Sequence, residues 1–120
     1  MAVSDNVKRG TIELLILTLL DFGDMYGYEL VQEIKDRSNG LYTMQESSLY
    51  PSLYRLLDKG LISDRQEKVG KRRTRVYYHL EDTGRTYLTE IRKEYLSLSR
   101  GVLSILKINS LEEMVDEEHE

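Results

Sequence analysis

The chain has 120 residues, of which 40% are hydrophobic. This is enough for one compact domain with an accessory element and too little for two independent domains. With no cysteine and only two histidines, the chain is expected to have no disulfide framework, no metal site and no cofactor. The formal net charge is −4, but six acids lie in the last nine residues, so residues 1–111 carry 17 bases and 15 acids, or +2. The whole-chain charge therefore does not exclude a polyanionic partner.

The first predicted helix runs from Thr11 to Phe22 and is followed by a turn at Gly23 and Asp24. Apolar residues cover more than one of its faces, so the helix must be buried on both sides. Its apolar run is far shorter than the ~20 residues that a bilayer requires. Because the start of the chain also lacks the pattern of a signal peptide, we expect a cytoplasmic protein that does not interact with membranes.

Two further helices are predicted in the next part of the chain. The second runs from Tyr26 to Arg37 and ends at the Ser38-Asn39-Gly40 stop signal. The third begins near Glu46 to Ser48 and ends at Gly60. A pair of short helices in this order is typical of a helix-turn-helix unit.

The third helix has two chemically different faces. Four leucines (Leu49, Leu53, Leu56 and Leu57) share one narrow sector, and the opposite side is polar and small. A serine near a helix start is also a common cap, which is the alternative for each serine taken alone. A polar face that carries tyrosine and serine is, however, one that a DNA major groove can admit. The residues predicted to read DNA are Ser47, Ser48, Tyr50, Tyr54 and Arg55.

Two β-prone segments, at 61–67 and 74–80, predict an antiparallel hairpin with Gly70 in its turn. Between Arg65 and Arg75 the chain has six bases and one acid. Such a run on its own usually marks a solvated loop. Here the run directly follows a helix whose polar face fits a DNA groove, so it predicts a hairpin that neutralises DNA phosphates. We call this hairpin the wing. The predicted wing contacts are Lys68, Lys71, Arg72, Arg73 and Arg75.

A long fourth helix is predicted from Asp82 or Thr83 to about Lys107. Its apolar residues alternate three and four apart, which is the spacing of a coiled-coil stripe. The stripe could cover its own domain, but a helix ~36 Å long exceeds what a small winged core can use. Self-association is therefore favoured, with the two-sided first helix as the partner surface. The predicted dimer interface comprises Leu14, Leu17, Leu88, Ile91, Tyr95, Leu98, Val102 and Ile105.

These elements predict a mainly α (α+β) fold, a winged helix-turn-helix with a long C-terminal dimerisation helix. The expected divisions are a DNA-binding domain at residues 1–81, the dimerisation helix at 82–108 and a flexible acidic tail at 109–120.

The chain resembles the PadR family of bacterial transcriptional regulators, in the form with a single C-terminal helix. The resemblance covers roughly residues 9 to 85. It rests on RGT followed by ELLIL at 9–17, YGYEL at 26–30, SSLYPSLYRLLDKGLI at 47–62 and KRRTRVYYHLEDTGR at 71–85. Two features depart from the family pattern. Leu80-Glu81 replaces the usual Leu-Thr, which removes a hydroxyl cap before the fourth helix, and the basic stretch of the wing is longer.

The resemblance implies a homodimeric repressor that binds double-stranded DNA at a near-palindromic operator and leaves it when an effector arrives. In relatives that bind flat drugs, an aromatic residue of the fourth helix lines a pore at the dimer interface. Tyr95 occupies that position here, which implies a small aromatic or hydrophobic effector. The alternative for Tyr95 is that it only packs in the interface.

Two other functions compete with this one. An enzyme is not expected, because the residues offer no nucleophile with a matching base. A winged-helix module that binds protein without specific DNA binding is the other alternative. The wing's six bases in eleven residues favour DNA, because phosphate neutralisation requires cations and protein recognition does not.

Overall fold

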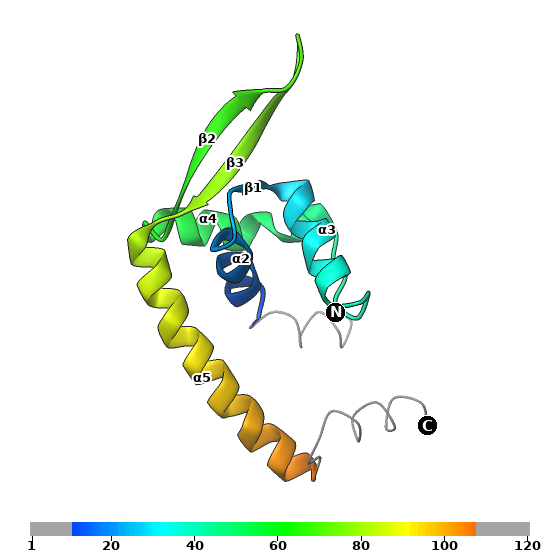
Figure 1. The fold of residues 1–120 in the computed structure, drawn as a ribbon, viewed down its shortest axis with the longest axis vertical. Helices are drawn as coiled ribbons and strands as arrows, with labels where there is room; N and C mark the ends of the chain where they lie inside the picture. The colour runs from blue at the N-terminus through cyan, green and yellow to red at the C-terminus, as the bar shows by residue number, and fades with distance from the viewer. Residues whose placement is uncertain (1–10, 108–120) are drawn as a thin grey trace. The chain divides into compact units, whose positions relative to one another are not determined.

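The computed structural model describes residues 11–107 and has the winged helix-turn-helix arrangement expected from the sequence (Figure 1). Three short helices precede a two-stranded hairpin, and one long helix follows it. The elements in chain order are α2 (Ile12–Leu20), β1 (Met25–Tyr26), α3 (Gly27–Arg37), the 3₁₀ turn η1 (Glu46–Ser48), α4 (Tyr50–Asp58), β2 (Ile62–Lys68), β3 (Thr74–Leu80) and α5 (Asp82–Leu106).

The predicted helices are confirmed, with ends that differ by a few residues. Asn39 and Gly40 follow α3 with φ of +55° and +79°, in the left-handed region that ends a helix. The third predicted helix divides into η1 and α4, and Pro51 lies in the first turn of α4, where its missing N–H costs no helical hydrogen bond.

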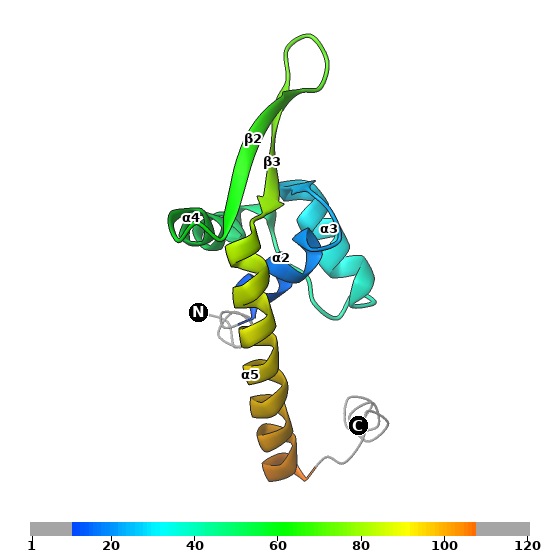
Figure 2. The same cartoon turned by 60° about the vertical axis from the view of Figure 1, so that its left-hand side comes forward.

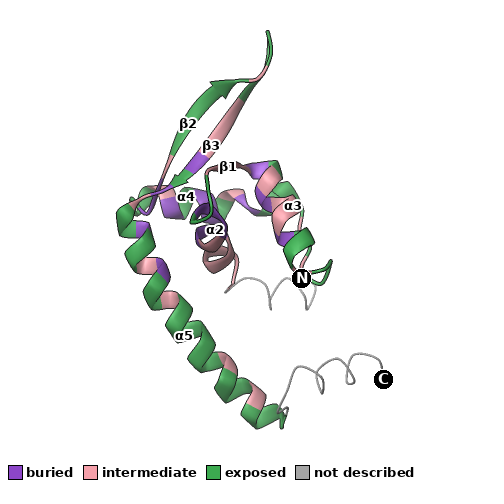
Figure 3. Ribbon diagram, viewed as in Figure 1, coloured by how far each residue is buried: buried purple, intermediate pink, exposed green. Residues whose placement is uncertain are grey.

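The chain divides into two compact units, one ending at Leu88 and the other beginning at Thr89. The core of the first unit gathers apolar side chains from α2, α3, α4 and the strands (Figure 3). Those with no exposed surface are Ile16, Leu17, Leu30, Leu49, Leu53 and Leu56. Leu53 and Leu56 of α4, and Leu49 just before it, belong to the predicted apolar sector, so the opposite side of α4 must face outward.

A three-stranded antiparallel sheet in the order β1-β3-β2 supports the wing. The β2–β3 ladder is continuous from the pair Ile62–Leu80 to the pair Lys68–Thr74. The hairpin therefore projects from the helices as a two-stranded arm with an open loop at its tip (Figure 2). The sequence did not predict β1, since a strand of two residues has no periodicity to detect.

The start of α5 packs tightly against the turn after α4. A Cβ at Gly84 would lie 2.1 Å from the backbone oxygen of Leu61, whose carbonyl also accepts a hydrogen bond from the Glu81 N–H. Glycine is therefore required here for close backbone approach.

We expect Gly84→Ala to lower the free energy of unfolding by about 1–3 kcal/mol, the usual cost of overpacking. Gly23→Ala is the matched control, because a Cβ at Gly23 meets nothing within 4 Å. Urea unfolding of both variants measures the difference. Equal stability of the two variants would mean that α5 does not pack here as described.

From Thr89 onward, the described part of the second unit is the remainder of α5. Several of its large apolar side chains are exposed, with Leu98 70% and Ile105 81% accessible. The predicted acidic tail at 109–120 lies outside the described residues. Within residues 11–107, no helix is both long and apolar enough to span a bilayer.

Candidate nucleic-acid interface

The outward face of α4, with η1 before it, carries most of the side chains predicted to read DNA. Ser47, Ser48 and Tyr54 are exposed, Tyr54 to 61%. Leu49, Leu53 and Leu56 pack the other face into the core. The backbone positions of the exposed side chains are therefore fixed.

Tyr50 lies between the core and this exposed face. Its hydroxyl donates a hydrogen bond to Glu46 Oε1 at 3.3 Å, and its ring centroid lies 6.0 Å from that of Tyr54. Burial raises the pKa of the Tyr50 hydroxyl, and the Glu46 carboxylate raises it further. Tyr50 is therefore a neutral hydrogen-bond donor near pH 7, and its ring packs beside that of Tyr54.

Arg55 is held by a different set of partners. Its Nε donates to Glu13 Oε1 of α2 at 2.9 Å, and its Nη2 donates to the hydroxyl of Ser52 at 2.9 Å. Ser52 is itself buried. The structure thus joins Arg55 to the first helix, not to the exposed side chains of α4.

The tip of the wing brings together most of the predicted phosphate contacts. Lys68, Lys71, Arg72 and Arg73 are all exposed. The Val69 N–H donates to the Arg73 carbonyl at 2.9 Å and closes the loop, and Gly70 has a φ of +103° that favours glycine. The tip is therefore a short, closed loop surrounded by cations.

Arg75 differs from the tip cations because an aromatic ring holds it. Its guanidinium lies 4.3 Å from the centroid of the Tyr26 ring, a cation–π distance. Tyr26 meets Tyr77 edge to face at 5.5 Å, and Tyr77 in turn lies 5.2 Å from the guanidinium of Arg65. The base of the wing is therefore a pair of rings with a cation at each end, and the Tyr26 ring fixes the position of Arg75.

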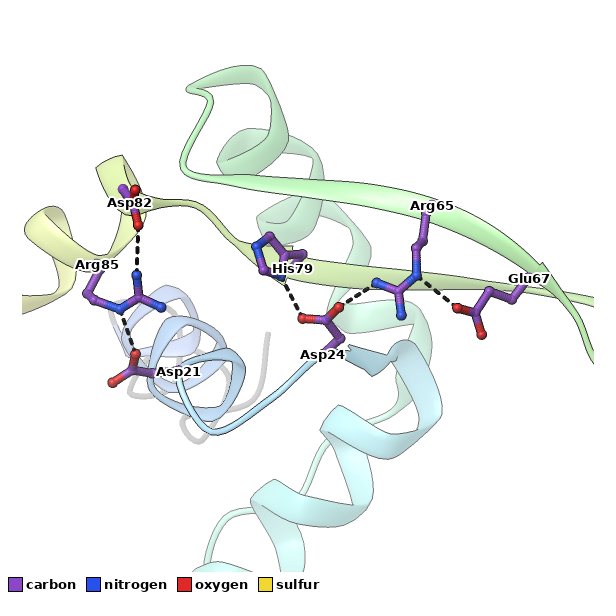
Figure 4. A network of polar contacts seen from close by, with 7 residues as sticks. All are labelled: Asp21, Asp24, Arg65, Glu67, His79, Asp82 and Arg85. Atoms are coloured by element: carbon purple, nitrogen blue, oxygen red, sulfur yellow. Dashed lines mark hydrogen bonds and ion pairs between the residues drawn. The ribbon is translucent and has the colours of Figure 1, made fainter.

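A network of polar contacts joins Asp24, the residue before β1, to β2 and β3 (Figure 4). Asp24 accepts from Arg65 and contacts His79 Nδ1 at 2.7 Å, and Arg65 also pairs with Glu67 at 2.9 Å. Partial burial raises the pKa of Asp24, but the hydrogen bonds and charges of His79 and Arg65 outweigh this effect and hold the pKa below its ordinary value. Two carboxylates therefore compensate the charge of Arg65, which is one of the six bases counted between Arg65 and Arg75 in the sequence.

A second pair of contacts in Figure 4 fixes the start of α5. Arg85 donates to Asp82 at 2.9 Å and to Asp21, just after α2, at 3.0 Å.

In the first unit Tyr78 is only 4% exposed, and burial is the main cause that raises its pKa to about 12. Tyr78 is therefore a residue of the core.

The residues predicted for the dimer interface fall into two groups in the structure. Leu17 and Leu88 are buried in the chain's own core, so they have almost no surface left for a partner. Leu14 and Ile91 are partly exposed. The exposed members are Tyr95, Leu98, Val102 and Ile105.

An apolar hollow of about 210 Å³ lies between α2 and α3 in the first unit. Leu15 lines it from α2, Phe22 from the turn after α2, and Ile34 from α3. Within residues 11–107, no group of His, Cys, Asp and Glu side chains could hold a metal ion.

Comparison with known proteins places this geometry among transcriptional regulators. The family model described as "Transcriptional regulator PadR-like family" matches residues 16–90. The transcriptional regulator YqjI of Escherichia coli is 34% identical over 86 residues, which are 72% of this chain and 40% of YqjI.

Solved structures give the same result for the fold. A transcriptional regulator from Clostridium thermocellum has a TM-score of 0.74 and 31% identity, over 82% of this chain and 95% of that one. Bacillus subtilis PadR, solved in complex with operator DNA, has a TM-score of 0.62 and 29% identity, over 67% of this chain and 46% of that one. The chain thus spans less than half the length of YqjI and of Bacillus subtilis PadR.

Proposed function

Because the chain belongs to the PadR-like family of transcriptional regulators, we propose that it is a sequence-specific repressor that binds a near-palindromic operator as a homodimer. One observation carries the proposal. A helix that exposes Tyr54 and Arg55, with Ser47 and Ser48 exposed just before it, precedes an arm whose tip exposes Lys68, Lys71, Arg72 and Arg73. The operator complex of Bacillus subtilis PadR supports double-stranded DNA as the partner.

Sequence reading is assigned to the exposed side chains of η1 and α4. Ser47, Ser48 and Tyr54 offer hydroxyl groups that can donate to or accept from base edges in the major groove. Tyr50 and Arg55 act beside them as positioning residues, because Glu46 holds the first and Glu13 holds the second. Arg55 can still contact a phosphate, since about half of its side chain is exposed.

The homodimer is assigned to α5. The exposed stripe of Leu98, Val102 and Ile105 would be costly to leave in water along several helical turns. The apolar hollow between α2 and α3 is the surface that we assign to the partner's α5. Two such contacts would hold two copies of α4 about one DNA turn (~34 Å) apart.

Release from the operator is assigned to a small aromatic or hydrophobic effector at the dimer interface. Tyr95 is 43% exposed on the stripe of α5, where its ring could stack on a flat ligand. A ligand that changes how the two α5 helices cross would change the spacing of the two α4 helices.

We expect Ser48→Ala and Tyr54→Ala each to change base preference at one operator position and to cost ~1–3 kcal/mol of binding free energy, the usual cost of removing a base contact. Selection of sites from a random DNA pool measures the preference. Lys35→Ala, an exposed change at the end of α3, is the control. If both α4 variants select the wild-type site with wild-type affinity, α4 does not read the sequence.

A further inference from the structure

A polar hollow of about 520 Å³ lies beside the wing and includes no residue of α4. Its walls come from the first turn of α3, from the start of η1 and from the end of the wing loop. The residues that give it its chemistry are Tyr26, Tyr28, Glu46, Arg73 and Arg75. All of them belong to the first compact unit.

The hollow has a net positive charge. Arg73 and Arg75 contribute two cations, and Glu46 is the one carboxylate among the lining residues. Glu46 is held by the Tyr50 hydroxyl at 3.3 Å and lies against Gly27, where a Cβ would be only 3.0 Å from its Oε1. An anion in the hollow would therefore meet two cations and one carboxylate that is already hydrogen-bonded.

One of the two cations is fixed before any ligand arrives. The Tyr26 ring holds the Arg75 guanidinium at 4.3 Å, and Tyr26 is fixed by its ladder pairing with Tyr77. Less rotamer entropy is lost when a cation already held in place binds its partner.

Tyr28 adds a hydrogen-bond donor that the core does not need. It lies in the first turn of α3 and is 54% exposed. A phenol that lines the same hollow as two guanidinium groups adds a donor to their positive charge, which suits a phosphate oxygen better than a base edge that needs matched donors and acceptors.

We infer that this hollow binds a phosphodiester group of the DNA backbone, with Tyr28 donating a hydrogen bond and Arg73 and Arg75 neutralising the charge. The site rests on the proposed function, because it needs duplex DNA on the wing. It includes neither Lys71 nor Arg72 of the wing tip, and it makes the first turn of α3 a third contact region. Such contacts set the position of the duplex and carry no sequence information.

The test uses the full chain and two duplexes, one of mixed sequence and one selected from a random pool. Tyr28→Phe should weaken binding to both duplexes by the same factor, about tenfold for each hydrogen bond to a charged group that is removed, and so about a hundredfold for a dimer with two such sites. The slope of log K against log salt should not change, because the phenol is uncharged. Tyr87→Phe is the control, since Tyr87 lies in α5 outside the hollow.

A second variant should change the DNA affinity in the opposite direction. Glu46→Gln removes the carboxylate from the hollow and should raise the affinity for both duplexes severalfold. If the wild-type protein binds DNA but neither variant changes the affinity, the phosphate site is wrong while the proposed function stands. A weakening confined to the selected duplex would make Tyr28 a base contact and would also overturn the site. If the wild-type protein binds neither duplex, the proposed function itself fails.

Discussion

Replacing both Leu98 and Val102 with aspartate is expected to convert the protein to a monomer and to weaken binding to operator DNA by more than about a hundredfold. Both side chains are exposed on α5 of the single chain, to 70% and 49%, so the change should not disturb the core of the first unit. In a dimer the same positions would bury four carboxylates against apolar surface, which is prohibitive. In a dimer, binding of the first subunit raises the effective concentration of the second subunit at its half-site, which increases the affinity by ~10²–10⁴-fold. A monomer loses this gain.

Light scattering at micromolar concentration measures the mass, and a titration of DNA measures the affinity. The unmodified chain should have a mass of about twice 14.1 kDa, and the variant the mass of one chain. Arg100→Asp with Ser104→Asp is the control, because both positions are exposed on α5 outside the stripe. A single-chain mass for the unmodified protein would remove the proposed dimer and the proposed effector switch.

Replacing Lys71 and Arg72 with alanine should give the second large effect. Both residues lie at the wing tip between the two strands and outside the hollow that contains Tyr28. Neutralisation of one phosphate contributes about 0.9 to the slope of log K against log salt. If both side chains bind phosphates, a dimer that lacks two such cations per subunit should therefore have a slope smaller by nearly four units.

Titrations at several salt concentrations measure this slope, and the unfolding free energy should stay unchanged because both residues are exposed. Lys35→Ala with Arg92→Ala is the control, since it removes two exposed cations from α3 and α5. An unchanged slope in the wing variant would show that the tip does not bind phosphates.

The sequence was sufficient to predict α4 and its buried face, because the pattern of apolar residues that defines them is local. Leu49, Leu53 and Leu56 repeat at helical spacing, and all three are fully buried. The same spacing predicts that Tyr54 and Ser48 face outward, as they do. The wing strands were predictable for a similar reason, because β-prone residues flank a glycine among repelling cations.

Contacts between distant parts of the chain were not predictable in this way. Arg55 pairs with Glu13, 42 residues away, and Arg65 pairs with Asp24, 41 residues away. No periodicity connects such residues, so the sequence predicted Arg55 as a DNA contact and counted Arg65 simply as one of the bases of the wing. The hollow beside Tyr28 was missed for the same reason, because its walls come from three separate segments.

The stripe of α5 shows where a periodic pattern remains ambiguous. Leu88 fits the repeat as well as Leu98 does, yet Leu88 is 7% exposed and Leu98 is 70% exposed. A repeat shows which side of a helix is apolar, but it does not show whether that side packs on its own domain or on a second copy.

Selection of DNA sites by the unmodified protein from a random pool tests the central claim most directly. A homodimer that reads DNA with two copies of α4 should enrich an inverted repeat whose half-sites lie about one helical turn, roughly 10 bp, apart. Sequencing of the selected pool gives both the half-site and the spacing. A pool without an enriched motif, or with a single unpaired half-site, would contradict the account of this chain as a dimeric, sequence-specific DNA-binding regulator.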